Sequence, residues 1–381
     1  MLVIAGKLCY TDHIYTEKQE GGTPVADKVL VAMSGGVDSS VAALLLRDAG
    51  YDARGVTLQL YDNEDAGLPR ERTCCSLDDV NDARRVAARL GIPFTVFNFK
   101  EDFRARVMDR FADAYRRGRT PNPCIDCNRF IKFGKLMQRM EELEARYVAT
   151  GHYARVAYDA SSGRWLLKKG LDAGKDQSYV LYALTQWELS HLLLPLGELT
   201  KARVRELAEE HGFSNAHKRD SQDICFVPDG DYAAFITRYT GETFPAGEFI
   251  GTAGQVYGEH RGVIHYTVGQ RKGLGLSFPQ PMYVCKVDPQ RNQVTLGTHQ
   301  ELFSSTLTAR DINLIAVEAI PTPLRVKAKI RYRQAEQPAT VLQTGPDELQ
   351  VTFDEPQRAV TPGQALVLYQ GDTVVGGGTI C

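Results

Sequence analysis

Short apolar runs alternate with segments of helical periodicity between residues 28 and 150. The first run, VLVAM at 29–33, precedes a helical pattern that ends at Gly50, and a second helical pattern ends at Gly91. A later pattern over 129–145 repeats its apolar residues at helical spacing. This alternation predicts a parallel α/β sheet, and ligands on such sheets bind at the carboxyl ends of the strands.

The pattern changes after about Arg219, where glycines, prolines and short alternating segments dominate. Such segments predict β structure, with a small barrel or sandwich in about the last ninety residues. We therefore expect an N-terminal extension (1–27), a parallel-sheet α/β domain (28–218), a small central β-rich domain (219–290) and a C-terminal β-barrel-like domain (291–381).

Composition narrows the class of protein. The chain has 381 residues, of which 43% are hydrophobic and 24% are charged, as expected for a globular protein of two or three domains. No apolar run approaches the roughly 18 residues of a membrane span, and the first residues lack the features of a signal peptide. We expect a cytoplasmic protein without a membrane partner. Because the net charge is −2, a nucleic acid would have to bind to local basic patches.

The chain has eight cysteines, and only Cys124 and Cys127 form a C-x-x-C pair. Clusters of cysteines in a large cytoplasmic chain are more often catalytic or metal-binding than disulfide-bonded. The adjacent Cys74 and Cys75 have poor geometry for a shared ligand set, so we interpret them as incidental. Three others are expected to be ordinary small apolar residues: Cys9, Cys285 and Cys381.

The segment SGGVDSS at 34–40 lies between the first strand and the first helix. A glycine-rich turn in this place directs backbone N–H groups and the positive end of the helix dipole to one point, which suits an anion. Ser34, Ser39 and Ser40 add hydroxyl donors. A bare pair of glycines would be more typical of a structural turn, and neither G-x-x-x-x-G-K-[ST] nor a strand-linked G-x-G-x-x-G occurs here.

The order S-G-G-x-D-S after a first strand resembles the pyrophosphate loop (PP-loop) of the ATP pyrophosphatases, which split ATP into AMP and pyrophosphate. The resemblance implies that the loop holds the departing pyrophosphate and that Asp38 organises the geometry of the metal and the phosphates. Mg²⁺ would accompany ATP, because it neutralises charge on the leaving oxygens. The residues that the resemblance assigns to ATP in this loop are Ala32, Met33, Ser34, Gly35, Gly36, Val37, Asp38 and Ser39.

Five further stretches narrow the substrate: TPNPCIDCN (120–128), ATGHYA (149–154), KDQSYVL (175–181), SQDICFV (221–227) and GQRKGLG (269–275). Together they resemble the tRNA-specific 2-thiouridylases, the MnmA family, from about Lys28 to the C-terminus. The resemblance implies ATP-dependent 2-thiolation of the wobble uridine of tRNA. The C2 oxygen would be adenylated with release of pyrophosphate, and a cysteine persulfide would supply the sulfur.

The resemblance also assigns roles to two cysteines. Cys127 matches the family's nucleophile and Cys225 its persulfide carrier, and the two would form a transient disulfide. A protein that donates persulfide sulfur would then be a partner, beside tRNA. We expect Cys127 in a proline-rich loop just before a basic helix, where the helix N-terminus and nearby cations would lower the pKa of its thiol.

A second mechanism stays open, because many relatives carry Asp where this chain has Cys124. Cys124, Cys127 and Cys225 could hold three corners of a [4Fe–4S] cluster and leave one iron open to bind sulfide. A structural zinc is less complete, since three thiolates would lack a clear fourth ligand.

The remaining assignments also follow from the resemblance. Leu58 and Gly151 would line the ATP site, and the target base would lie against Asn122, Pro123 and Cys124. The residues assigned to tRNA are His152, Lys175, Asp176, Gln177, Arg331, Tyr332 and Gln364. Independently, RVKAKIRYR at 325–333 alternates five basic residues with other side chains, which on a strand would place all five charges on one face. Such a face favours binding to phosphates.

Two other functions compete with this interpretation. An amide-forming synthetase of the same ATP pyrophosphatase class would need a nitrogen source, and it would give Cys127 and Cys225 no role. A non-catalytic RNA-binding module with structural metal would bind tRNA without releasing pyrophosphate.

Overall fold

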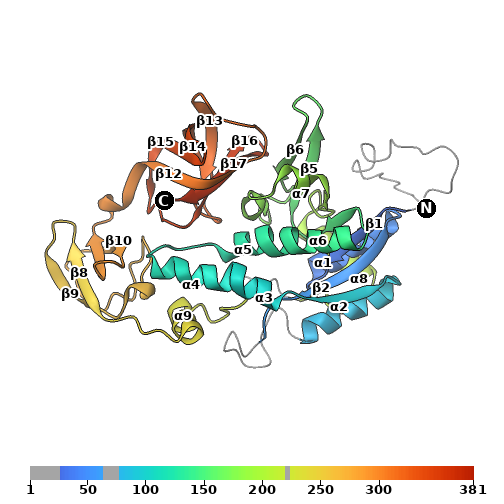
Figure 1. Ribbon diagram of the computed structural model, residues 1–381, viewed down its shortest axis with the longest axis horizontal. Helices are drawn as coiled ribbons and strands as arrows, with labels where there is room; N and C mark the ends of the chain where they lie inside the picture. The colour runs from blue at the N-terminus through green and yellow to red at the C-terminus, as the bar shows by residue number, and fades with distance from the viewer. Residues whose placement is uncertain (1–25, 63–76, 219–223) are drawn as a thin grey trace.

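The computed structural model describes residues 26–62, 77–218 and 224–381 (Figure 1). The predicted extension, apart from residues 26 and 27, and the cysteines Cys9, Cys74 and Cys75 lie outside the described residues. In the part of the chain that is described, no helix is long and apolar enough to cross a membrane.

A five-stranded parallel sheet forms the centre of the N-terminal domain, which confirms the predicted α/β class. Its strand order is β3–β2–β1–β4–β7. The bounds are β1 Lys28–Ala32, β2 Asp52–Gln59, β3 Phe94–Asn98, β4 Tyr147–Ala149 and β7 Leu192–Leu193. The chain order of the strands reverses between β1 and β4, and such a reversal is where open α/β sheets bind their ligands.

Helices cover both faces of this sheet. On one face lie α1 (Val37–Asp48), α2 (Leu77–Leu90) and α8 (Lys201–Glu210), which pack on Val29 and Val31 of β1. Leu30, between those two valines, faces the other layer, because successive side chains of a strand point to opposite faces. That layer consists of α3 (Lys100–Phe103), η1 (Arg104–Met108), α4 (Asp109–Arg116), α5 (Pro123–Asp126), η2 (Cys127–Lys135) and α6 (Leu136–Glu142).

A small central domain follows, with one helix and a four-stranded sheet of order β10–β11–β8–β9. Its elements are α9 Tyr232–Thr240, β8 Gly247–Gly251, β9 Val256–His260, η4 Val263–His265, β10 Tyr283–Asp288 and β11 Gln293–Gly297. The sequence analysis missed α9, although Asp231 caps its start and Gly241, at φ +68°, ends it in the left-handed conformation.

The C-terminal domain is a closed six-stranded barrel, as predicted from the alternating segments. The strands follow in the order β12–β15–β14–β13–β16–β17, and β17 pairs back to β12. The bounds are η5 Gln300–Leu302, β12 Phe303–Leu314, β13 Leu324–Lys329, β14 Gln337–Gly345, β15 Glu348–Arg358, β16 Ala365–Gln370 and β17 Thr373–Ile380.

A hairpin of the N-terminal domain joins the barrel to the α/β layers. Its strands, β5 (Ala154–Asp159) and β6 (Arg164–Lys169), extend the barrel sheet through the pair Lys168–Thr373. Three short elements follow the hairpin along the chain: η3 Ser178–Leu181, α7 Gln186–Ser190 and β7. The domain boundaries proposed from the sequence stay predictions.

Candidate active site

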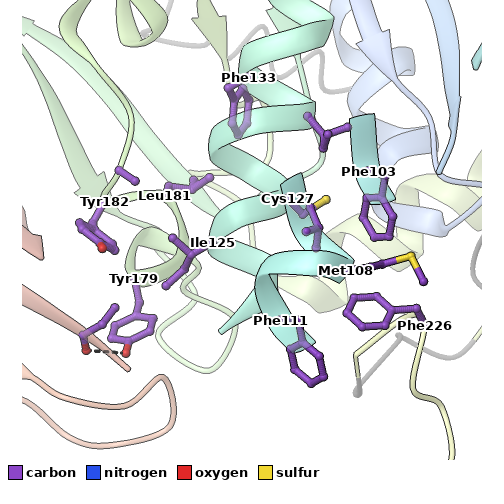
Figure 2. Packing of buried hydrophobic residues seen from close by; sticks show 14 of the residues in the cluster. Phe103, Met108, Phe111, Ile125, Cys127, Phe133, Tyr179, Leu181, Tyr182 and Phe226 are labelled. Carbon is purple, nitrogen blue, oxygen red and sulfur yellow. Dashed lines mark hydrogen bonds between the residues drawn. The ribbon is translucent and has the colours of Figure 1, made fainter. Parts of the chain in front are cut away.

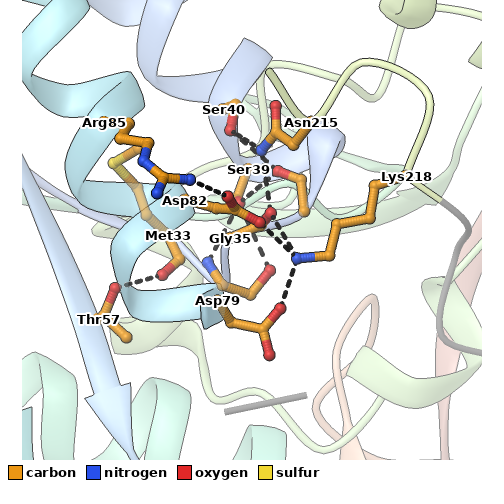
Figure 3. Close-up of polar contacts among 12 residues, drawn as sticks. Met33, Gly35, Ser39, Ser40, Thr57, Asp79, Asp82, Arg85, Asn215 and Lys218 are labelled. Carbon is orange, nitrogen blue, oxygen red and sulfur yellow. Dashed lines mark hydrogen bonds and ion pairs between the residues drawn. The ribbon is translucent and has the colours of Figure 1, made fainter. Parts of the chain in front are cut away.

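The loop between β1 and α1 is anchored to β2 by hydrogen bonds. The Met33 amide donates to the carbonyl of Val56 (2.8 Å), and the Thr57 hydroxyl donates to the carbonyl of Met33 (2.6 Å; Figure 3). Further along the loop, the Ser34 amide donates to Ser39 Oγ (3.1 Å). These bonds fix the turn from which the first helix begins.

Glycine is required at position 35 of this loop. Gly35 has φ +78°, and a Cβ there would collide with the backbone carbonyl of Asp79 on α2. Gly36 is the N-cap of α1, and no side chain caps the helix. The first amides of α1 and the positive end of its dipole are therefore presented without a side-chain acceptor, which fits a phosphate group.

Asp38 is held by two groups that the sequence analysis did not identify. Lys201 Nζ, on α8, lies 2.8 Å from each carboxylate oxygen, and the Tyr153 hydroxyl donates to Oδ1 (2.7 Å). Lys201 is only 8% exposed. Asp38 of the loop therefore pairs with a nearly buried ammonium group from α8.

Residues that follow α8 bind to the loop and to the neighbouring helix α2 (Figure 3). Asn215 Nδ2 donates to the carbonyl of Gly35 (2.9 Å) and to Ser40 Oγ (3.0 Å). Lys218 Nζ pairs with Asp79 (2.6 Å) and Asp82 (2.8 Å) on α2. No sequence pattern marks Asn215 or Lys218, because their partners lie more than a hundred residues away.

Two further residues that the resemblance assigns to ATP lie on neighbouring strand ends and strands, Gly151 after β4 and Leu58 on β2. A Cβ on Gly151, after β4, would lie 2.7 Å from the Ser39 amide, so the two loops are in direct contact. Leu58 is 8% exposed on β2. The structure thus brings Gly151 against the glycine-rich loop, as expected for neighbouring strand ends, whereas the contact of Leu58 with adenine stays a prediction.

The helix that carries the C-x-x-C pair begins earlier than predicted. Pro123 is its first residue, and the Asn122 side chain accepts a bond from the Cys124 amide (3.1 Å) as the N-cap. Proline fits the first turn, where its missing N–H has no helical partner. The prediction that Cys127 lies in a loop is therefore wrong: Cys127 lies inside the helix, at the start of η2.

Burial dominates the chemistry of Cys127. Its side chain is 8% exposed and belongs to a hydrophobic cluster with Phe103, Met108 and Phe226 (Figure 2). This burial raises the pKa of Cys127 to about 11, and the opposing effect of Lys132 is smaller. The expected lowering of its pKa is thus wrong for this conformation, because loss of solvation outweighs nearby positive charge.

Cys225 approaches the same cluster from the chain after α8. Its half-buried side chain packs against the cluster that contains Cys127, and its carbonyl accepts a bond from the Tyr61 hydroxyl (2.7 Å). Neither Cys127 nor Cys225 forms a disulfide with another described residue. Their transient disulfide stays a prediction.

The three cysteines do not form a ligand set for a cluster. Cys124 is exposed, whereas Cys127 is buried one helical turn away. Within residues 26–62, 77–218 and 224–381, no three His, Cys, Asp or Glu side chains are placed to share a metal ion. The arrangement of Cys124, Cys127 and Cys225 in this structure therefore does not fit the [4Fe–4S] alternative.

His152 lies close to the helix that carries Cys124 and Cys127 (α5 and η2), which we call the cysteine helix. Its Nδ1 is 2.7 Å from the Thr150 hydroxyl, and its ring lies 6.0 Å from that of Phe133 on η2. Burial, aided by the charge of Lys132, lowers the pKa of His152 well below its usual value. The imidazole is therefore neutral near pH 7, and a contact with tRNA would use a neutral ring.

The KDQ stretch is held by backbone contacts. Asp176 accepts bonds from the amides of Gly170 and Ser178 (both 3.1 Å), and Gln177 Oε1 accepts from the Tyr153 amide (3.0 Å). Lys175 closes a turn through its amide. These residues order the segment that leads from the hairpin to η3.

The barrel contributes two contacts to the same region. The Tyr332 hydroxyl donates to the carbonyl of Asp176 (3.2 Å), and Gln364 Nε2 donates to the carbonyl of Thr120 (2.7 Å). The structure thus brings barrel residues assigned to tRNA next to the helical domain. Whether they contact tRNA stays a prediction.

Comparison with known proteins identifies the family. Over 353 residues, 93% of this chain and 98% of the relative, the chain is 50% identical to the tRNA-specific 2-thiouridylase MnmA of Clostridioides difficile. It is also 50% identical over 371 residues to the protein of that name in Symbiobacterium thermophilum, covering 96% of this chain and 95% of that one. The chain belongs to the tRNA-specific 2-thiouridylase family.

Family models match all three parts of the chain. A tRNA methyl transferase HUP domain matches residues 27–229, a tRNA methyl transferase PRC-barrel domain matches 233–298, and an aminomethyltransferase β-barrel domain matches 304–380. Among solved structures, a 4-thiouridine synthetase with RNA and ATP is 22% identical, with a TM-score of 0.34 over 55% of this chain and 47% of that chain. That likeness is too remote to bear on function.

The prediction that 325–333 forms one basic strand face is wrong. Strand β13 ends at Lys329, so the five basic residues of 325–333 do not share one strand face. Arg331 lies in the following turn, where its guanidinium donates to the carbonyl of Ala359 (2.7 Å) and to the Thr361 hydroxyl (2.8 Å). The alternating pattern predicted a longer strand, because it continues through the turn that begins at Ile330.

Proposed function

We propose that this protein is an ATP-dependent tRNA sulfurtransferase that converts the wobble uridine of tRNA to 2-thiouridine. The curated relatives carry the name 2-thiouridylase at about 50% identity over nearly their whole length. The observation that carries the proposal is the uncapped N-terminus of α1 behind an S-G-G-x-D-S loop. An adenylating enzyme needs such a site for the phosphates that it releases.

In the first step, the uridine C2 oxygen attacks the α-phosphorus of ATP. A bond forms between this oxygen and the α-phosphorus, the bond to the β-phosphate breaks, and pyrophosphate leaves towards the loop. Lys201 and the first amides of α1 would stabilise the charge on the leaving group. Mg²⁺ would enter with ATP and neutralise part of that charge.

In the second step, the terminal sulfur of a persulfide on Cys225 attacks C2, and AMP leaves with the original oxygen. The thiolate of Cys127 then attacks the Cys225 sulfur, which releases 2-thiouridine and forms the Cys127–Cys225 disulfide. A thiol reductant must return two electrons before the next cycle. Because Cys127 is buried, its sulfur must become accessible during this sequence.

The test uses chelator-treated protein with a tRNA transcript, Mg-ATP and a persulfide donor, followed by nucleoside mass spectrometry. We expect 2-thiouridine with the wild type and none with Cys127→Ser or Cys225→Ser. Full activity of either variant would remove that cysteine from the mechanism. Activity that returned only after anaerobic iron–sulfur reconstitution would contradict the persulfide route, and a methylated nucleoside would contradict thiolation.

A further inference from the structure

An open cleft lies between the helical layer and the barrel. It has a volume of about 800 Å³, and its helical wall carries Arg110, Arg119, Arg129 and Phe130. The barrel wall adds Arg310, on β12. We call this surface the arginine cleft, after these four arginines and Phe130.

The arginine cleft adjoins the N-terminal end of the cysteine helix. A neighbouring hollow of about 220 Å³ shares Arg110, Arg119 and Arg129 with it and is also lined by Asn122, the N-cap of α5. Neither space is lined by the residues assigned to tRNA, such as His152, but the hollow is lined by Asn122, which the resemblance assigns to the target base. The cleft itself is lined by none of these residues, and it adjoins the expected position of the target base.

Positive charge gathers around one aromatic ring at this place. The guanidinium carbons of Arg106, Arg110 and Arg129 lie 5.7, 5.1 and 5.3 Å from the centre of the Phe130 ring. Three like charges around one ring repel each other, and the ring compensates only partly. A polyanion would relieve this repulsion.

Acidic side chains hold some of these arginines without filling the cleft. Arg129 pairs with Asp311 (2.6 Å), Arg310 with Glu348 (2.8 Å) and Arg110 more loosely with Asp126 (3.3 Å). In the described part of the chain, Arg119 has no ion-pair partner. The Arg310–Glu348 pair is accessible to solvent, with side chains 66% and 32% exposed. Such pairs are weak, so a phosphate group can replace this carboxylate.

Backbone geometry places the barrel wall towards the cleft. Asp311 has φ +53°, and the pairing of β12 with β17 shifts register between Arg310 and Asn313. A bulge of this kind redirects side chains at the edge of a sheet. Here it directs Asp311 to Arg129 of the helical wall, so the two walls are built as one surface.

We propose that the arginine cleft binds the sugar–phosphate backbone of tRNA. An arginine fork binds two oxygens of one phosphate group, and a nucleic acid presents such groups at regular spacing, which suits several neighbouring arginines better than the scattered carboxylates of an acidic peptide do. The proposal rests on the proposed function, which makes tRNA the substrate. It adds a binding region outside the residues already assigned to tRNA.

The test compares a double variant, Arg119→Ala with Arg310→Ala, with a matched control, Arg47→Ala with Arg54→Ala. The control arginines are partly exposed and paired with aspartates far from the cleft. Binding of an unmodified tRNA transcript is measured from low to moderate salt. We expect the cleft variant to bind several-fold more weakly, with a salt slope smaller by roughly 0.7 to 0.9 for each phosphate that the protein no longer neutralises.

Wild-type affinity and slope in the cleft variant, or an equally weakened control, would overturn the proposal. Unchanged tRNA binding with slower sulfur transfer from a donor protein would overturn it in favour of an acidic protein partner. A wild-type protein that makes no 2-thiouridine would refute the proposed function but would leave the tRNA-binding result standing.

Discussion

Asp38 is the residue on which the adenylation site depends most directly. Its carboxylate pairs with the nearly buried Lys201 and accepts a bond from Tyr153, so it orients the ammonium group beside the loop. Asp38→Asn keeps the size of the side chain and removes its charge. We expect pyrophosphate release to slow by about a hundredfold or more, as when a charge-stabilising group is removed.

Binding of tRNA provides the control for Asp38→Asn. The substitution should leave tRNA affinity unchanged, because the loop would act on ATP alone. If tRNA affinity fell together with pyrophosphate release, the loop would have a structural role instead.

The burial of Cys127 predicts how the reactivity of its thiol depends on pH. Burial raises the pKa of its thiol to about 11, so the thiolate is a small fraction at neutral pH. Between pH 7 and pH 9 this fraction, and with it the rate of alkylation by iodoacetamide, should rise about tenfold for each pH unit. Peptide mass spectrometry would follow Cys127 beside the exposed Cys124. Alkylation of Cys127 at pH 7 as fast as that of Cys124 would contradict the buried thiol.

At the scale of elements, the start of the cysteine helix decides where both thiols lie. Asn122 caps the helix through a bond from the Cys124 amide, and removal of such a cap costs about 0.5–2 kcal/mol. Asn122→Ala should lower the free energy of unfolding in urea by that amount and reduce 2-thiouridine formation. Asn122→Asp is the matched control, because a carboxylate also caps a helix.

The two variants separate the roles of Asn122. Stability restored by Asp with activity still absent would indicate a contact with the target base. Equal stability of the Ala variant and the wild type would contradict the capping role.

The sequence predicted elements better than it predicted contacts between them. The parallel sheet was predictable because each short apolar run is followed by a helical pattern with a clear end, such as Gly50 or Gly91. The start of the cysteine helix was missed because apolar periodicity becomes visible only near Phe130, although Asn122 and Pro123 form a recognisable helix start. Lys201, like Asn215, reaches the loop only through tertiary packing, which local patterns do not encode.

At the scale of the whole molecule, the proposed tRNA contacts come from both the barrel and the helical domain. Arg331 lies at their junction, where burial lowers the pKa of its guanidinium. Arg331→Ala should weaken tRNA binding and reduce the slope of its salt dependence by about one. Arg331→Lys, which keeps the charge, should retain most of the slope. An unchanged slope in the Ala variant would remove Arg331 from the phosphate contacts.

We propose that ATP activates the C2 oxygen of uridine by adenylation. The most direct measurement uses tRNA that carries a heavy oxygen isotope at C2 of the wobble uridine, followed by mass spectrometry of the AMP released. We expect the heavy oxygen to appear in the phosphate of AMP in step with 2-thiouridine, because this oxygen leaves with the nucleotide. AMP without the label, formed while 2-thiouridine accumulates, would contradict it.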